Sequence, residues 1–149
     1  MVYLSIKPLI LNALPACLMT DSKKKILIVE DNDFVRMQIV RYLREDHYDT
    51  AEARDGNEAL TMMGADIDVA IVDVRMEPMG GLDFVRRLRG DEIDTPVIFV
   101  TGDQNSDLLE QASKWGVGAV LIKPVMKDRL IVAVERVARL PIQKQPSGF

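Results

Sequence analysis

The sequence has 149 residues, which predicts one domain with short tails, since two full domains would need a longer chain. Hydrophobic residues make up 48%, charged residues 28%, and the net charge is -4, which excludes a disordered or fibrous chain and argues against a nucleic-acid clamp. The single cysteine, Cys17, excludes an internal disulfide and a zinc site of several thiolates, and it indicates a reducing, cytoplasmic setting.

The N-terminal segment is set apart from the rest of the chain. Residues 9–19 are mostly apolar but are interrupted by an asparagine and a proline, and they are too few to cross a bilayer. We interpret residues 1–18 as an upstream translation start without a role. The alternative is a signal peptide, including a lipoprotein type that uses Leu14, Pro15, Ala16 and Cys17. We interpret 1–23 as an extension, 24–140 as the domain, and 141–149, rich in Pro, Gln and Gly, as a flexible tail.

Strands and helices alternate along the domain. Short apolar runs that end in polar residues predict strands, and apolar residues three and four apart predict helices. The first strand ends just before Glu30, and Asn32 or Asp33 is a suitable cap for the helix that follows. In chain order, strands are predicted at 26–29, 50–53, 69–72, 96–100 and 119–122, and helices at 34–43, 59–63, 81–88, 107–115 and 127–140.

This alternation predicts an α/β fold. Strands that are apolar throughout are typical of a parallel sheet covered by helices on both faces, as in an open doubly wound domain. Functional groups in such a domain gather beyond the carboxyl ends of the strands. Four strands end in reactive side chains there: Glu30 and Asp31, Asp73, Thr101, and Lys123. Each of these residues alone is most simply a helix cap or a solvated side chain. Four strands that end in this way at the same edge of the sheet indicate a functional site.

The carboxylates at this edge predict a cation site. In the strand order 2-1-3-4-5, the first and third strands are neighbours about 4.8 Å apart, which brings Glu30, Asp31 and Asp73 together. Two unit charges about 4 Å apart repel by about 4 kcal/mol at an effective dielectric of 20, so the cluster needs a cation or protons. Oxygen ligands without a histidine or thiolate favour Mg²⁺. Thr101 and Lys123 could then engage a phosphoryl group that Asp73 attacks as nucleophile.

Five segments in order resemble the receiver domain of two-component response regulators. They are Lys25–Asn32, Val69–Asp73, Met76–Leu82, Phe99–Gly102 and Leu121–Pro124. The resemblance runs from about Lys24 to Leu140, which is nearly the whole chain. It implies a flavodoxin-like doubly wound fold, with a five-stranded parallel sheet in the order 2-1-3-4-5 and five helices.

The resemblance also implies the chemistry of the site. Mg²⁺ is expected to bind to the carboxylates of Glu30, Asp31 and Asp73 and to the backbone carbonyl of Arg75. Asp73 is expected to be the phosphoacceptor, with Thr101 and Lys123 on the phosphoryl group. The peptide bond before Pro124 is expected to be cis, which proline permits at little cost.

The partners follow from the same resemblance. A histidine kinase or histidine phosphotransferase would donate the phosphoryl group, docking near the first helix and the loop after the fifth strand. Those segments offer Phe34, Val35, Met37, Pro124 and Val125. Most of these are expected to be core in whole or part, although helical spacing alone does not say which face is exposed. Only nine residues follow Leu140, which predicts a stand-alone receiver that signals to an unknown downstream protein. A second copy of the chain is a further candidate partner, whereas direct contact with nucleic acid or membrane is not expected. Such a protein transfers and loses its own phosphoryl group but is not a conventional metabolic enzyme.

Three positions depart from the family pattern. The aromatic residue usually found three residues before the lysine is Val120, so the aromatic part of the switch is missing. The proline usually found four residues after the phosphoacceptor is Glu77, with Pro78 next, so this loop is expected to bend differently. Trp115 stands where a small residue is common, and we interpret it as a packing residue, with a partner-binding anchor as the alternative.

Opposite charges flank the predicted site. Arg75 lies two residues after Asp73, and Asp103 lies two residues after Thr101. If these side chains pair across the mouth of the site, they would hinder an attacking water and lengthen the phosphorylated lifetime. The alternative is two solvated side chains without a kinetic effect, since exposed pairs contribute only about 0 to 1 kcal/mol.

Other functions fit the sequence less well. A flavin-binding electron carrier needs a phosphate loop after the first strand, and the acidic segment 30–33 would repel a phosphate unless a metal intervened. An aspartate-nucleophile phosphatase needs a second acid two residues after the first, where this chain has Arg75. The serious rival is a degenerate receiver that acts as an unphosphorylated protein-binding module, because Val120 has replaced the aromatic residue.

Overall fold

The computed structural model describes residues 23–103 and 105–139, so the segments 1–22 and 140–149, with Cys17, lie outside the described residues. The strands are β1 (Lys25–Val29), β2 (Asp49–Ala53), β3 (Val69–Asp73), β4 (Val97–Thr101) and β5 (Ala119–Ile122). The helices are α2 (Asp33–Glu45), α3 (Gly56–Met62), α4 (Gly81–Gly90), α5 (Ser106–Lys114) and α6 (Lys127–Arg139).

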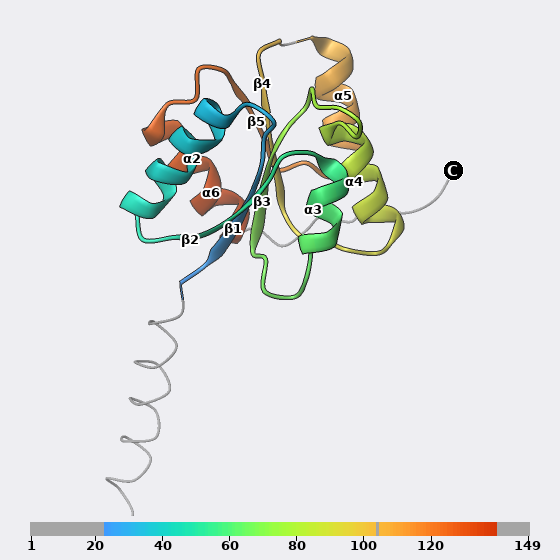
Figure 1. Ribbon diagram of the computed structural model, residues 1–149. Coiled ribbons are helices and arrows are strands. Elements are labelled where there is room, and N and C mark those ends of the chain that lie inside the picture. The colour runs from blue at the N-terminus through green and yellow to red at the C-terminus, as the bar shows by residue number, and fades with distance from the viewer. Residues whose placement is uncertain (1–22, 104, 140–149) are drawn as a thin grey trace, which may run out of the picture.

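The sheet confirms the predicted topology. Its strands run in the order β2-β1-β3-β4-β5, and every neighbouring pair is parallel. Helices α2 and α6 cover one face, while α3, α4 and α5 cover the other (Figure 1). The chain therefore reverses its direction of winding between β1 and β3, and the carboxyl ends of these two neighbouring strands form the switch point of the fold.

Alternate residues of the central strands enter two separate cores. On β1, Ile26 and Ile28 pack with α2 and α6, whereas Leu27 and Val29 pack with α3 and α4. Strands β3 and β4 are buried at every position, as the continuous apolar runs predict. The edge strands β2 and β5 are only partly buried, because each has a neighbour on one side alone.

Helix α2 differs from its sequence-based prediction in which residues face the core. Asn32 is the N-cap, since its side-chain oxygen accepts from the backbone N–H groups of Phe34 and Val35. The expectation that the apolar residues of this segment are mostly core is wrong for Phe34 and Met37, which are 83% and 63% exposed. The buried positions of the helix are occupied by Arg36, Ile39, Val40 and Leu43. Residues 34 and 37 fall outside this stripe, and a charged side chain occupies one of its positions.

Trp115, at the end of α5, is a packing residue, as interpreted from the sequence. It is half-buried and packs against the core cluster between the sheet and α3, α4 and α5. The side chain of Arg89 on α4 donates hydrogen bonds to the backbone carbonyls of Trp115, Ile93 and Thr95 at 3.0, 2.8 and 3.0 Å. These bonds tie the ends of α4 and α5 to the chain that leads into β4.

Close packing at the start of α4 generates a stability prediction. A Cβ atom at Gly81 would lie 2.5 Å from the backbone oxygen of Asp73, whereas one at Gly90, at the other end of the helix, would meet none of the described atoms within 4 Å. We expect Gly81→Ala to lower the free energy of unfolding by about 1 to 3 kcal/mol through overpacking. Gly90→Ala is the matched control and should lower it little or not at all. Urea denaturation measures both, and equal effects would contradict this account.

Candidate functional site

The structure brings the three predicted carboxylates together at the switch point. Glu30 and Asp31 directly follow β1, Asp73 ends β3, and these strands pair with Val29 opposite Val72. Glu30, Asp31 and Asp73 each offer a carboxylate oxygen, and these oxygens lie within 4.8 Å of one another. Glu30 and Asp73 are 1% and 5% exposed, whereas Asp31 is exposed, so the cluster opens to solvent on the Asp31 side.

Lys123 supplies a positive charge to the two buried carboxylates. It follows β5, two strands away from β3, yet its Nζ atom lies 3.1 Å from Oε2 of Glu30 and 3.4 Å from Oδ2 of Asp73. The long flexible side chain therefore reaches the centre of the site, as the sequence analysis expects. The peptide bond between Lys123 and Pro124 is cis, as the family resemblance implies, and that between Glu77 and Pro78 is also cis.

The protonation of Glu30 is shifted by its surroundings. Burial, opposed by a hydrogen bond from the backbone N–H of Asn32 and reinforced by the negative charge of Asp73, raises the pKa of Glu30 from 4.5 to about 7. The neighbouring ammonium of Lys123 limits this rise. The charged form of Glu30 therefore needs more positive charge than Lys123 alone provides.

Thr101 lies at the same edge with its hydroxyl engaged locally. The residue is buried, its hydroxyl donates to the backbone carbonyl of Asp103 at 2.8 Å, and it accepts from the Asp103 backbone N–H at 3.1 Å. The expected contact of Thr101 with a phosphoryl group therefore requires this hydroxyl to change its hydrogen bond.

Arg75 and Asp103 form the ion pair that the sequence analysis considers. Nη2 of Arg75 lies 2.8 Å from Oδ2 of Asp103, and the two side chains are 76% and 58% exposed respectively. The pair connects the loop after β3 with the loop after β4, directly beside the site. The backbone N–H of Arg75 also donates a long bond of 3.4 Å to Oδ1 of Asp73.

The residues of the cluster fit a divalent cation. Oε2 of Glu30 is buried and accepts no hydrogen bond from the described residues, despite its contact with Lys123. The cluster offers only carboxylate oxygens, which are hard ligands, and the exposure of Asp31 leaves room for water. This combination suits Mg²⁺, which keeps several waters and binds through few carboxylates.

Arg36 is a neighbour of the site that was not predicted from the sequence. Its guanidinium is buried beneath the turn that carries Glu30 and Asp31, and it donates to the backbone carbonyl of Glu30 at 2.8 Å. The signal was present in the helical pattern, because position 36 lies on the same face as the buried residues 39, 40 and 43.

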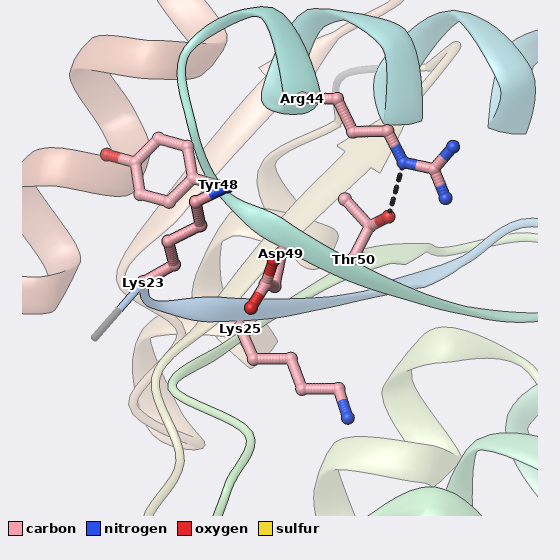
Figure 2. A pocket seen from close by; sticks show the side chains of 6 residues that line it. All are labelled: Lys23, Lys25, Arg44, Tyr48, Asp49 and Thr50. Carbon is pink, nitrogen blue, oxygen red and sulfur yellow. Dashed lines mark hydrogen bonds between the residues drawn. The ribbon is translucent and has the colours of Figure 1, made fainter. Parts of the chain in front are cut away.

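A hollow on the opposite edge of the sheet is separate from this cluster. Figure 2 shows its lining, which comes from the start of β1, the end of α2 and the start of β2. The lining residues are Lys23, Lys25, Arg44, Tyr48, Asp49 and Thr50. Because they lie at the amino ends of the strands, this hollow lies away from the carboxylate cluster at the carboxyl ends.

The fold and the site define a doubly wound α/β domain with a carboxylate and lysine cluster at its switch point. The family model of the response regulator receiver domain matches residues 26–135. The chemotaxis protein CheY of Pseudomonas aeruginosa is 36% identical over 121 residues, which cover 76% of this chain and 98% of CheY. The chain therefore belongs to the receiver domain family of two-component response regulators.

Other relatives place the same domain in longer proteins. The chain is 34% identical to the transcriptional regulatory protein PdtaR of Mycobacterium tuberculosis and spans about half of it, 55%. It is 31% identical to the sensor kinase/phosphatase CqsS of Vibrio cholerae and spans 16% of that protein. Among solved structures, CheY4 of Vibrio cholerae superposes with a TM-score of 0.73 at 29% identity, covering 78% of this chain and 99% of CheY4. Among the described residues, no helix has the length and apolar character needed to cross a membrane.

The raised pKa of Glu30 generates a prediction for the Mg²⁺-free protein. A folded-state pKa of about 7 against an ordinary 4.5 means that the folded protein holds an extra proton between these values. This stabilising contribution is complete below pH 4.5 and is lost as the pH rises through 7. Between pH 5.5 and 8, we expect the free energy of unfolding to fall by about 2 kcal/mol in the wild type.

Glu30→Gln removes this titration and provides the comparison. Its free energy of unfolding should change less over the same pH range, as measured by urea denaturation in the presence of a chelator. Identical pH dependence in the two proteins would show that Glu30 does not titrate in this way.

Proposed function

We propose that Asp73 accepts a phosphoryl group from phosphohistidine on a histidine kinase or histidine phosphotransferase. A carboxylate oxygen of Asp73 forms a bond to phosphorus, the bond from phosphorus to the imidazole nitrogen breaks, and the imidazole leaves with that electron pair. The observation that carries this proposal is the cluster of Glu30, Asp31 and Asp73 beside the ammonium of Lys123.

Each residue of the cluster has a distinct part in the proposed transfer. Glu30, Asp31, Asp73 and the backbone carbonyl of Arg75 would hold Mg²⁺, which when bound offsets the charge of the carboxylates and of the phosphoryl oxygens. Lys123 already contacts Asp73, so its ammonium is placed to pair with an oxygen of a group attached there. The burial of Asp73 lowers the local dielectric and strengthens these charge interactions.

Thr101 is the proposed sensor of the phosphoryl group. Its hydroxyl would exchange the backbone carbonyl of Asp103 for a phosphoryl oxygen, which requires the loop after β4 to move. The position of the usual aromatic is taken by Val120, which is half-buried against the core beside α5. The surface change would therefore pass through Thr101 and the backbone of this loop rather than through an aromatic side chain.

The exposed start of α2 is the proposed docking site for the phosphohistidine partner. Phe34 and Met37 stand out from the helix, and Met126, after β5, is 54% exposed. A shallow hollow on this helix is lined by Phe34, Val35, Met37, Gln38 and Arg41. Large apolar side chains beside the acidic cluster suit a partner that brings its phosphohistidine to Asp73 through an apolar contact.

Phosphorylation in the test tube distinguishes the receiver from an unphosphorylated binding module. After incubation with acetyl phosphate and Mg²⁺, intact mass spectrometry should show the addition of one phosphoryl group. Asp73→Asn should abolish this addition, because the amide is a poor nucleophile. Asp68→Asn, a carboxylate at the other end of β3, is the control and should retain it. If the wild type gains no mass, the binding-module alternative is favoured.

The ion pair between Arg75 and Asp103 generates a prediction about phosphoryl lifetime. As proposed from the sequence, the paired side chains hinder the water that would attack the aspartyl phosphate. We expect Arg75→Ala to lose its phosphoryl group several-fold faster than the wild type. Arg87 on α4 forms an exposed ion pair with Asp91, which directly follows the helix, away from the loops of the site. Arg87→Ala therefore serves as the control. An unchanged rate of phosphate release in Arg75→Ala removes the idea.

A further inference from the structure

The two metal-binding carboxylates beyond β1 depend on a turn in the backbone. In a regular strand, consecutive side chains project to opposite faces of the sheet. Glu30 and Asp31 are consecutive, yet both reach within 4.8 Å of Asp73 and of each other. The peptide unit between Glu30 and Asp31 must therefore hold an orientation that the strand alone does not impose.

Arg36 contacts that peptide unit directly. Its Nη1 atom donates to the backbone carbonyl of Glu30 at 2.8 Å, and this carbonyl belongs to the peptide that joins Glu30 to Asp31. The backbone N–H of Glu30 on the other side remains paired with Ala53 at the end of β2, at 3.0 Å. The chain is thus fixed on both sides of Glu30, by the sheet on one side and by the guanidinium on the other.

The guanidinium of Arg36 is itself fixed by two acids. Nη2 pairs with Asp33 in the first turn of α2, and Nε pairs with Glu52 on β2 at 3.1 Å. The Arg36 side chain is 9% exposed, so a charge at this position needs these partners. Arginine matches this arrangement better than lysine, since its planar fork donates in three directions at once.

From this geometry we propose that Arg36 is a positioning residue for the proposed metal site. Through the Glu30 carbonyl, it sets the peptide that aims the Glu30 and Asp31 carboxylates at Asp73. This inference rests on the proposed function, because it assumes that the cluster binds Mg²⁺. Residues that orient metal ligands typically change metal affinity by about 10- to 100-fold when they are replaced.

Magnesium titration calorimetry on the full chain tests the proposal. Arg36→Ala should bind Mg²⁺ at least about 10-fold more weakly than the wild type. Arg36→Lys keeps the positive charge but replaces the planar guanidinium with a single ammonium group. This variant should therefore bind Mg²⁺ with intermediate affinity. Arg41→Ala, which removes an exposed arginine from the same helix, is the matched control and should bind as the wild type does. The unfolding temperature of each variant is measured first, and the titrations are carried out at a temperature at which all of the variants are folded.

A second readout separates positioning from general loss of stability. With acetyl phosphate as donor, Arg36→Lys should need several-fold more Mg²⁺ for half-maximal phosphorylation, while its rate at saturating Mg²⁺ stays near that of the wild type. Glu52→Gln weakens only the outer pairing of Arg36, so it should lower stability while changing Mg²⁺ affinity less than twofold.

The outcomes distinguish this inference from the proposed function. If the wild type binds Mg²⁺ and both Arg36 variants bind it within twofold of that affinity, Arg36 does not position the site and the proposed function stands. If Arg36→Ala fails to fold, the Arg36→Lys titration decides the question. If the wild type takes up no Mg²⁺ at millimolar concentration, the proposed metal site and this inference both fail.

Discussion

Carboxylates at the ends of neighbouring parallel strands repel one another, and the site is organised around that repulsion. Glu30 and Asp73 are buried on adjacent strands, where two unit charges about 4 Å apart cost about 4 kcal/mol at an effective dielectric of 20. Lys123, which follows β5, lies close to both carboxylates and offsets part of this cost. The remaining negative charge draws a proton onto Glu30 or a cation into the cluster. The proposed affinity for a metal ion and the rise in the pKa of Glu30 therefore have the same electrostatic cause.

The loops around the site differ in how firmly they are held. The turn after β1 is fixed by buried contacts to Arg36, which is anchored by Asp33 and Glu52. The loop after β4 is held by the hydroxyl of Thr101 and by an exposed ion pair, which contributes only about 0 to 1 kcal/mol. A group added to Asp73 would therefore meet a turn held by buried contacts on one side and a loop held by weaker, exposed contacts on the other. This contrast suits the proposed function, in which the site holds a cation and the loop after β4 responds to the phosphoryl group.

The sequence predicted the sheet and the acidic cluster because both follow from patterns that are local in the chain. Apolar runs marked the buried strands, and the polar residues directly after them fell at one edge of the sheet. The side chain of Arg36 was missed because a charged residue on the core-facing stripe of α2 breaks the apolar pattern used to find that stripe. Phe34 and Met37 were placed partly in the core because spacing alone does not identify which apolar side chains of a helix remain outside. The partner of the Thr101 hydroxyl depends on the conformation of the loop after β4, which residue order did not reveal.

Trp115 gives this protein a built-in optical probe. It is the single tryptophan of the chain, it packs against the core beneath α4 and α5, and the charged groups of Arg86 and Lys114 lie 6.0 and 5.7 Å from its ring. Its position directly after α5, the helix that follows the loop beyond Thr101, couples the environment of the indole to movements of that helix. Indole emission depends on nearby charge and solvent, so a shift of α5 would be visible as a change in intrinsic fluorescence without any label attached to the chain.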